Sequence, residues 1–167
     1  MFRSLSAALA LTVLVPSLAF AQLSIAFDEG APKDRFTFLN GGKCALASAK
    51  LVLDLSTSRA GLIFDVTASG AGVDVFQPLD FVAGGDALGS IPKVRDGDNR
   101  LTMDITSLAP GAAIAFTIDV DDTLGGREIT VSDAEIAGAQ VSLTVKGRTI
   151  TAPFTKDARA SISTTCP

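Results

Sequence analysis

The chain has 167 residues, a formal net charge of −4, and no His, Trp or Tyr. This acidic balance excludes the basic footprint of a nucleic-acid-binding protein. Without His, the usual catalytic triads and the His-ligated zinc and copper sites are excluded as well. Hydrophobic residues make up 47% of the chain, which is enough for the core of one domain.

The first 21 residues have the pattern of a secretory signal peptide. Arg3 supplies a positive charge, an uncharged and mostly apolar run follows, and Ala19-Phe20-Ala21 is a small-x-small cleavage site. We therefore expect residues 1–21 to be removed and residues 22–167 to form one exported domain that begins at Gln22. No later run is long and apolar enough for a transmembrane helix, so no transmembrane segment is expected.

Cys44 and Cys166 are the two cysteines of the chain. In an oxidising compartment we expect them to form one intramolecular disulfide. An intermolecular bridge or free thiols are the alternatives. The intramolecular bridge would tie the C-terminus to an early turn of the fold.

Short runs of alternating apolar and polar residues recur along the chain, bounded by Gly, Pro, Asn or Asp. Such alternation places successive side chains on opposite faces of a strand. We expect strands at 23–27, 35–39, 51–55, 62–66, 73–76, 101–105, 112–122, 127–131, 141–145, 149–151 and 160–163. Asn40-Gly41-Gly42 predicts a tight hairpin after the second of these. Residues 77–85 show no clear pattern.

Residues 112–122 have the clearest alternation and are expected to form the central strand. Large apolar side chains occupy every second position, namely Ile114, Phe116, Ile118 and Val120. The residues between them change from small to acidic, so the second face is expected to end in the carboxylates of Asp119 and Asp121. Residues 127–131 are expected to pair with this strand across a turn at Gly125-Gly126.

Strand signals about ten residues apart, separated by turn residues, are typical of an antiparallel sandwich. We therefore predict an all-β fold with a single antiparallel β-sandwich of the immunoglobulin-like kind. The buried Trp of antibody domains is absent. The chain has no internal repeat and no linker, which indicates one domain.

Acidic residues cluster at the ends of two predicted strands. Ca²⁺ takes six to eight oxygen ligands, often from several loops. If both clusters lie at the same end of the sandwich, the candidate ligands of a weak calcium site are Asp96, Asp98, Asp119, Asp121 and Asp122. The alternative is that these residues are solvated turns, because Asp is a common turn residue. The sequence demands no cofactor, and calcium is the one candidate.

Catalysis is not expected from this set of residues. Bridged cysteines leave no thiol nucleophile, and no Ser lies in a G-x-S-x-G elbow. Gly70-Ala71-Gly72 lacks the third glycine of a dinucleotide motif. Asp119 and Asp121 form a carboxylate pair of the kind that hydrolyses glycosides, but they lie on one strand, and the chain lacks the Trp and Tyr that form sugar platforms. A hydrolase is therefore the least favoured alternative.

Five runs follow one another in a characteristic order along the chain, namely 61–66, 72–78, 94–98, 116–123 and 127–131. With these runs the chain resembles small exported bacterial "aggregation factor core" proteins, named after a sponge cell-adhesion factor. The resemblance extends from about Phe27 to Val145. It implies an extracellular role in adhesion or in a matrix, assisted by calcium, and it assigns no role to any individual residue.

We therefore expect a secreted, non-enzymatic protein of the extracellular space or cell surface that acts in adhesion, aggregation or matrix contact. Its partner would be a protein or another cell-surface component, self-association included. The alternative is a periplasmic binding or accessory module for an envelope partner. Cell fractionation separates the two, because an adhesion protein is found in the medium or on the cell surface.

Overall fold

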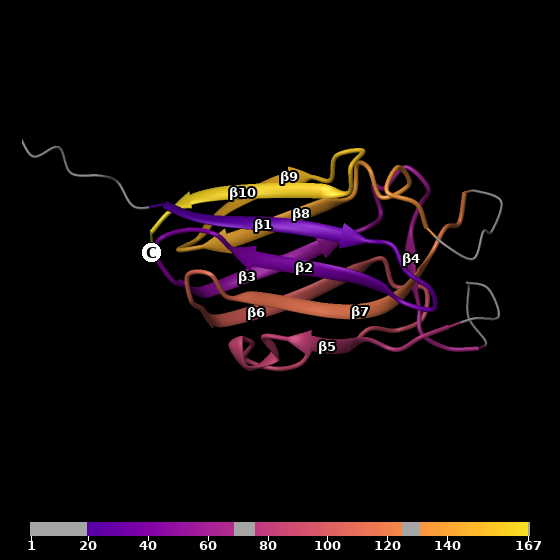
Figure 1. Cartoon of the computed structure of the whole chain (residues 1–167), viewed down its shortest axis with the longest axis horizontal. Helices are drawn as coiled ribbons and strands as arrows, with labels where there is room; N and C mark the ends of the chain where they lie inside the picture. The colour runs from indigo at the N-terminus through magenta and orange to yellow at the C-terminus, as the bar shows by residue number, and fades with distance from the viewer. Residues whose placement is uncertain (1–19, 69–75, 125–130, 167) are drawn as a thin grey trace, which may run out of the picture.

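The computed structural model describes residues 20–68, 76–124 and 131–166, and in it two antiparallel sheets pack face to face (Figure 1). In spatial order, the first sheet contains β10 (Arg159–Thr165), β1 (Phe20–Asp28), β2 (Asp34–Asn40), β7 (Ala113–Asp121) and β4 (Ile63–Asp65), and β5 (Asp80–Ala83) also pairs with β7. The second contains β6 (Arg100–Leu108), β3 (Leu46–Asp54), β8 (Gln140–Val145) and β9 (Arg148–Pro153). The predicted all-β antiparallel sandwich is confirmed.

Helical structure in the described residues is limited to one 3-10 turn, η1 (Gly85–Ala87), which follows β5. No helix in these parts of the chain is long and apolar enough to cross a membrane. The strands expected at 73–76 and 127–131, and the turn between β7 and the second of them, lie almost entirely outside the described residues.

The core lies between the two sheets and is built by the alternating apolar positions. Ile114, Phe116 and Ile118 of β7 are fully buried. The ring of Phe116 stacks on Phe36 of β2, with 5.2 Å between the ring centroids, and on Phe38, with 6.0 Å. The predicted core face is thus confirmed, and β7 is an interior strand of the first sheet that pairs with β2, β4 and β5.

The hairpin predicted at Asn40-Gly41-Gly42 is wrong. The strands on either side of it, β2 and β3, lie in different sheets, so the segment crosses the sandwich. Asn40 is buried, and its side-chain amide donates to the carbonyl oxygens of Cys44 and Leu108, each at 2.9 Å. The asparagine therefore holds a crossover between sheets instead of a turn within one.

The predicted disulfide between Cys44 and Cys166 is confirmed. Cys44 lies in the crossover between β2 and β3, and Cys166 follows β10. The bond thus joins the last strand of the first sheet to the segment that leads into the second sheet, across a sequence separation of 122 residues.

Candidate functional site

Buried aspartates gather where β7 meets β4, at one end of the first sheet (Figure 1). The antiparallel register places Asp65 opposite Asp119 and Ile63 opposite Asp121. Opposite residues share a face of the sheet, as do residues two apart on one strand, so the three carboxyl groups lie on one face. Asp65 is 0% exposed, Asp119 6% and Asp121 3%. Asp119 and Asp121 are therefore not solvated turn residues.

A fourth buried aspartate, Asp34, lies on β2 at the other edge of β7, opposite Ile118 and therefore on the other face of the sheet. One carboxyl oxygen of Asp34 accepts a hydrogen bond from the backbone N–H of Val120, and the other accepts one from Gly30, both at 3.1 Å. Asp34 is also buried, and the charges of Asp119 and Asp121 act on it. We refer to Asp34, Asp65, Asp119 and Asp121 as the carboxyl cluster.

The cluster contains buried oxygen atoms that have no hydrogen-bond partner among the described residues. They are both carboxyl oxygens of Asp65 and Oδ2 of Asp119. The carboxyl groups of Asp96 and Asp121 lie beside that of Asp65 and raise its pKa through side-chain hydrogen bonding and through their charge. Buried polar atoms in native proteins are nearly always satisfied, by protein, by water or by an ion. Asp65 is thus the residue that needs an explanation.

Burial makes the protonated forms of Asp34, Asp65 and Asp119 unusually stable. It raises the pKa of Asp34 to about 7, and the charges of Asp119 and Asp121 add to this effect. Burial likewise raises the pKa of Asp65 to about 7, assisted by Asp96 and Asp121. The pKa of Asp119 is raised to about 6, by burial and by the charge of Asp121. Near neutral pH the cluster must therefore hold protons, bind a cation, or sustain buried charge at a cost.

The loop that carries Asp96 and Asp98 lies along β4. The backbone N–H of Phe64 donates to the carbonyl oxygen of Asp98 at 2.8 Å, and that of Gly97 donates to Phe64 at 2.9 Å. Asp96 reaches the carboxyl cluster through its effect on Asp65. The condition set by the sequence, that both acidic groups lie at the same end of the sandwich, is therefore met.

The loop aspartates differ in what their carboxylates do. Oδ1 of Asp96 accepts hydrogen bonds from the backbone N–H groups of Val66 and Thr67, at 2.9 and 3.0 Å. Oδ2 of Asp98 accepts one from Arg95, at 2.8 Å, which closes its own turn. Asp98 thus fits the turn interpretation better than the ligand interpretation.

Three buried aspartates differ in whether the sequence predicted them. Asp122, a predicted ligand, is buried directly after β7. Asp34 and Asp65 were not predicted. Asp65 had one detectable signal, an acidic residue inside the apolar run 62–66, whereas Asp34 had none.

No three carboxyl groups in the described parts of the chain already converge into a metal-ligand shell. Cation binding would therefore need side chains of the cluster to move together. Asp65 and Asp119 have buried oxygens available for this. The described residues therefore contain no preformed metal site.

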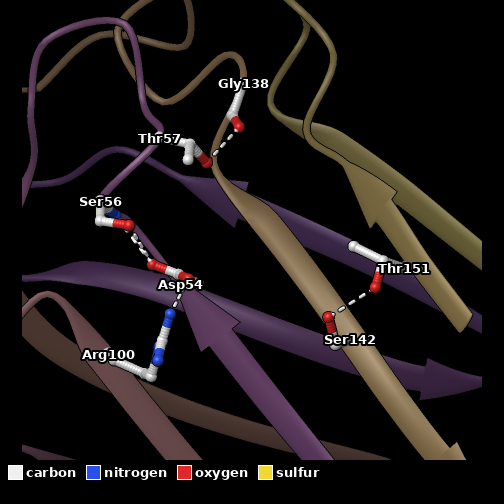
Figure 2. Close-up of polar contacts among 7 residues, drawn as sticks. All are labelled: Asp54, Ser56, Thr57, Arg100, Gly138, Ser142 and Thr151. Atoms are coloured by element: carbon white, nitrogen blue, oxygen red, sulfur yellow. Dashed lines mark hydrogen bonds and ion pairs between the residues drawn. The ribbon is translucent and has the colours of Figure 1, made fainter. Parts of the chain in front are cut away.

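A second group of polar contacts, on the second sheet, is fully paired (Figure 2). Oδ1 of Asp54 accepts hydrogen bonds from the backbone N–H and the hydroxyl of Ser56, and its Oδ2 pairs with the guanidinium of Arg100. Figure 2 also shows hydroxyl contacts between Thr57 and Gly138 and between Ser142 and Thr151. Although burial opposes it, the pairing with Ser56 and Arg100 lowers the pKa of Asp54. These contacts join neighbouring strands and loops and so stabilise the fold.

The raised pKa values predict an unusual dependence of stability on pH. The folded state binds protons at Asp34, Asp65 and Asp119 that the unfolded state releases. Their stabilising contribution is complete below the unfolded pKa of 3.8 and is lost as pH rises through about 6 to 7. We expect the free energy of unfolding, measured by urea titration in chelator, to be higher at about pH 5 than at about pH 8.

Asp65→Asn provides the control for this pH dependence. The amide cannot ionise, so the variant should lose less stability than the wild type as pH rises. Asp54 has a lowered pKa and acts in the opposite direction, but only at lower pH. Equal stability of the wild type at both pH values would contradict the prediction.

No family model and no curated protein matches this sequence. Among solved structures, the chain is similar to a family GH18 chitinase from Chromobacterium violaceum, with 14% identity and a TM-score of 0.35 over 80% of this chain and 18% of the enzyme. It is also similar to a GH20 exo beta-N-acetylglucosaminidase from Vibrio harveyi, with 16% identity and a TM-score of 0.33 over 80% of this chain and 17% of the enzyme. The chain spans less than a fifth of either enzyme. Likeness this distant carries no inference about chemistry.

Proposed function

We propose that this chain is an exported, non-enzymatic β-sandwich that acts in cell-surface adhesion or matrix contact, and that Ca²⁺ completes its carboxyl cluster. The observation that carries the proposal is the fully buried carboxyl group of Asp65, which shares a face with Asp119 and Asp121 and has the carboxyl group of Asp96 beside it. The disulfide between Cys44 and Cys166 supports export, because such bonds persist in oxidising compartments.

Calcium suits the chemistry of this cluster. It is a hard cation that takes carboxylate and backbone carbonyl oxygens in flexible geometry. Neighbouring carboxylates repel one another and lose hydration when buried, and a divalent cation offsets both effects. The candidate ligands are Asp65, Asp119, Asp121 and Asp96. Because side chains must move to form the shell, we expect an affinity of about 10⁻⁴ to 10⁻³ M, as in other extracellular calcium modules.

The proposed adhesion role is supported by the rigidity that a bound cation would give to one end of the sandwich. It would link β4, β7 and the loop at 95–98, which are distant in sequence, and so would stiffen one end of the sandwich. Exposed apolar side chains are available elsewhere for contact with a partner, namely Phe76, Val82, Ile91 and Leu124. The resemblance to exported aggregation factor core proteins supports the same role.

Millimolar Ca²⁺ is expected to raise the Tm by roughly 3–6 °C, and excess chelator to reverse the rise. Binding to the folded state at ten times the Kd adds about 1.4 kcal/mol to the free energy of unfolding, and this sets the size of the shift. The melt is followed by far-UV circular dichroism, because the chain has no Trp or Tyr.

Two variants make the calcium test specific. Asp65→Asn should abolish the shift in Tm, because the amide offers one neutral oxygen in place of a carboxylate. Asp104→Asn is the matched control and should retain it, because Asp104 is exposed and pairs with Lys50 at 3.7 Å. A melt that is indifferent to both calcium and chelator would refute the cation site.

Cell location is tested separately from cation binding. We expect the protein in the medium or on the cell surface when the full chain is expressed in an exporting bacterial host. Recovery in the periplasm alone would favour the alternative of an accessory module for an envelope partner. Retention in the cytoplasm would refute export.

A further inference from the structure

We infer that the leader is cleaved between Ala19 and Phe20, so that the exported protein begins at Phe20 and not at Gln22. The inference rests on the proposed export. Two overlapping small-x-small motifs are present, Ser17-Leu18-Ala19 and Ala19-Phe20-Ala21. The sequence pattern favours cleavage after Ala19-Phe20-Ala21, whereas the fold favours cleavage after Ser17-Leu18-Ala19.

Phe20 and Ala21 are part of β1 and both pair with β10, and Phe20 is also bonded on the other edge. The register with β10 places Phe20 opposite Thr165 and Ala21 opposite Thr164. On the other edge, the carbonyl oxygen of Phe20 accepts a hydrogen bond from the backbone N–H of Lys43, at 3.0 Å. Cleavage after Ala21 would remove these two residues from between their neighbours and leave backbone groups on both sides without partners.

The neighbouring segment packs closely against Ala21 and against the backbone of Phe20, whose side chain is 50% exposed. Ala21 is 2% exposed. A Cβ atom on Gly42 would lie 2.6 Å from the Cα of Ala21 and 2.6 Å from the carbonyl oxygen of Phe20, so only glycine permits the approach. The same Cβ would also lie 2.6 Å from the backbone nitrogen of Gln22, so a chain that begins at Gln22 would retain one of the three contacts.

The disulfide closes around the same two residues. Lys43 and Thr165, which flank Phe20 on opposite edges of β1, are each followed directly by a bridged cysteine. The bond between Cys44 and Cys166 therefore joins the two segments that bracket the start of β1.

The cleavage is a hydrolysis carried out by a signal peptidase of the exporting membrane. Water adds across the peptide bond, Ala19 retains the new carboxyl group, and Phe20 receives the proton as its free amine. This bond precedes β1. The bond between Ala21 and Gln22 lies inside the part of β1 that pairs with β10.

N-terminal sequencing and intact mass of the exported protein, expressed as the full chain, test the inference. A chain that begins at Phe20 is expected. A chain that begins at Gln22 overturns this inference but leaves the proposed export intact. A chain that retains Met1 overturns both.

A leader variant separates the two motifs without touching the folded domain. Ser17→Arg removes the small residue from Ser17-Leu18-Ala19 and leaves Ala19-Phe20-Ala21 unchanged. We expect the form that begins at Phe20 to disappear, with precursor or the Gln22 form in its place. Continued cleavage at Phe20 in this variant would overturn the assignment of the motif.

The structural basis is tested on two purified forms, one beginning at Phe20 and one at Gln22. The shorter form loses strand pairing on both edges of β1, so its Tm should be lower by roughly 2–8 °C. Equal Tm values would show that the first two residues of β1 contribute nothing to the fold, and would overturn the argument from strand pairing.

Discussion

Phe116→Ala is expected to lower the free energy of unfolding by about 3–5 kcal/mol, the range for deleting a buried phenylalanine side chain. Phe116 is 0% exposed and lies at the centre of an aromatic group. Its ring centroid is 5.2 Å from that of Phe36, 5.5 Å from Phe81 and 6.0 Å from Phe38. The substitution removes these ring contacts and leaves a cavity between the sheets. Urea titration followed by far-UV circular dichroism measures the loss.

Phe76→Ala is the matched control, because Phe76 is 36% exposed and lies outside the buried core. Its loss of stability should be well below half that of Phe116→Ala. If Phe116→Ala does not fold, Phe116→Leu retains most of the buried volume and should show a smaller, measurable loss. Similar losses at positions 76 and 116 would contradict the core assignment.

The alternation of apolar and polar side chains predicted most of the strands, because a strand with one buried face has apolar residues at every second position. In β7, the apolar positions face the second sheet, and no other register would bury them together. The short edge strand β5 was not predicted, because its four residues show no alternation. Its pairing with β7 includes an irregularity between Phe81 and Ala83. That strand depends on its neighbour more than on its own sequence pattern.

The failed hairpin shows a different limit. Asn40-Gly41-Gly42 has the local chemistry of a chain reversal, and the chain does change direction there. Whether the next strand joins the same sheet or the opposite one depends on tertiary contacts, here the hydrogen bonds from Asn40 to Cys44 and Leu108. Turn chemistry does not encode that choice.

The carboxyl cluster was only partly predictable. Asp119 and Asp121 follow from the alternation in β7, and Asp96 from the polar turn before β6. The burial of Asp34 and Asp65 arises from the pairing of β2 and β4 with β7, which no local pattern reveals. The sequence predicted Asp119 and Asp121 as carboxylates at the end of a strand. The same strand pairing buries them, so that keeping them charged costs free energy.

Replacing both Cys44 and Cys166 by Ser is expected to lower the free energy of unfolding by about 4–5 kcal/mol in the chain-entropy model. The disulfide closes a loop of 122 residues, so without it the unfolded chain gains many conformations. The urea midpoint should fall, and the m-value should rise because the unfolded chain exposes more surface.

Reduced wild-type protein provides the control for the serine variant, because it lacks the same crosslink but retains both sulfur atoms. The two should unfold at similar urea concentrations if the crosslink itself is responsible. The bond also brackets the start of β1, so its removal should destabilise the form that begins at Phe20 by freeing both neighbours of that strand end. If the free energy of unfolding of the double variant lies within about 1 kcal/mol of that of the oxidised wild type, the chain-entropy estimate fails for this protein. The sheets would then hold this end of the sandwich together without the disulfide.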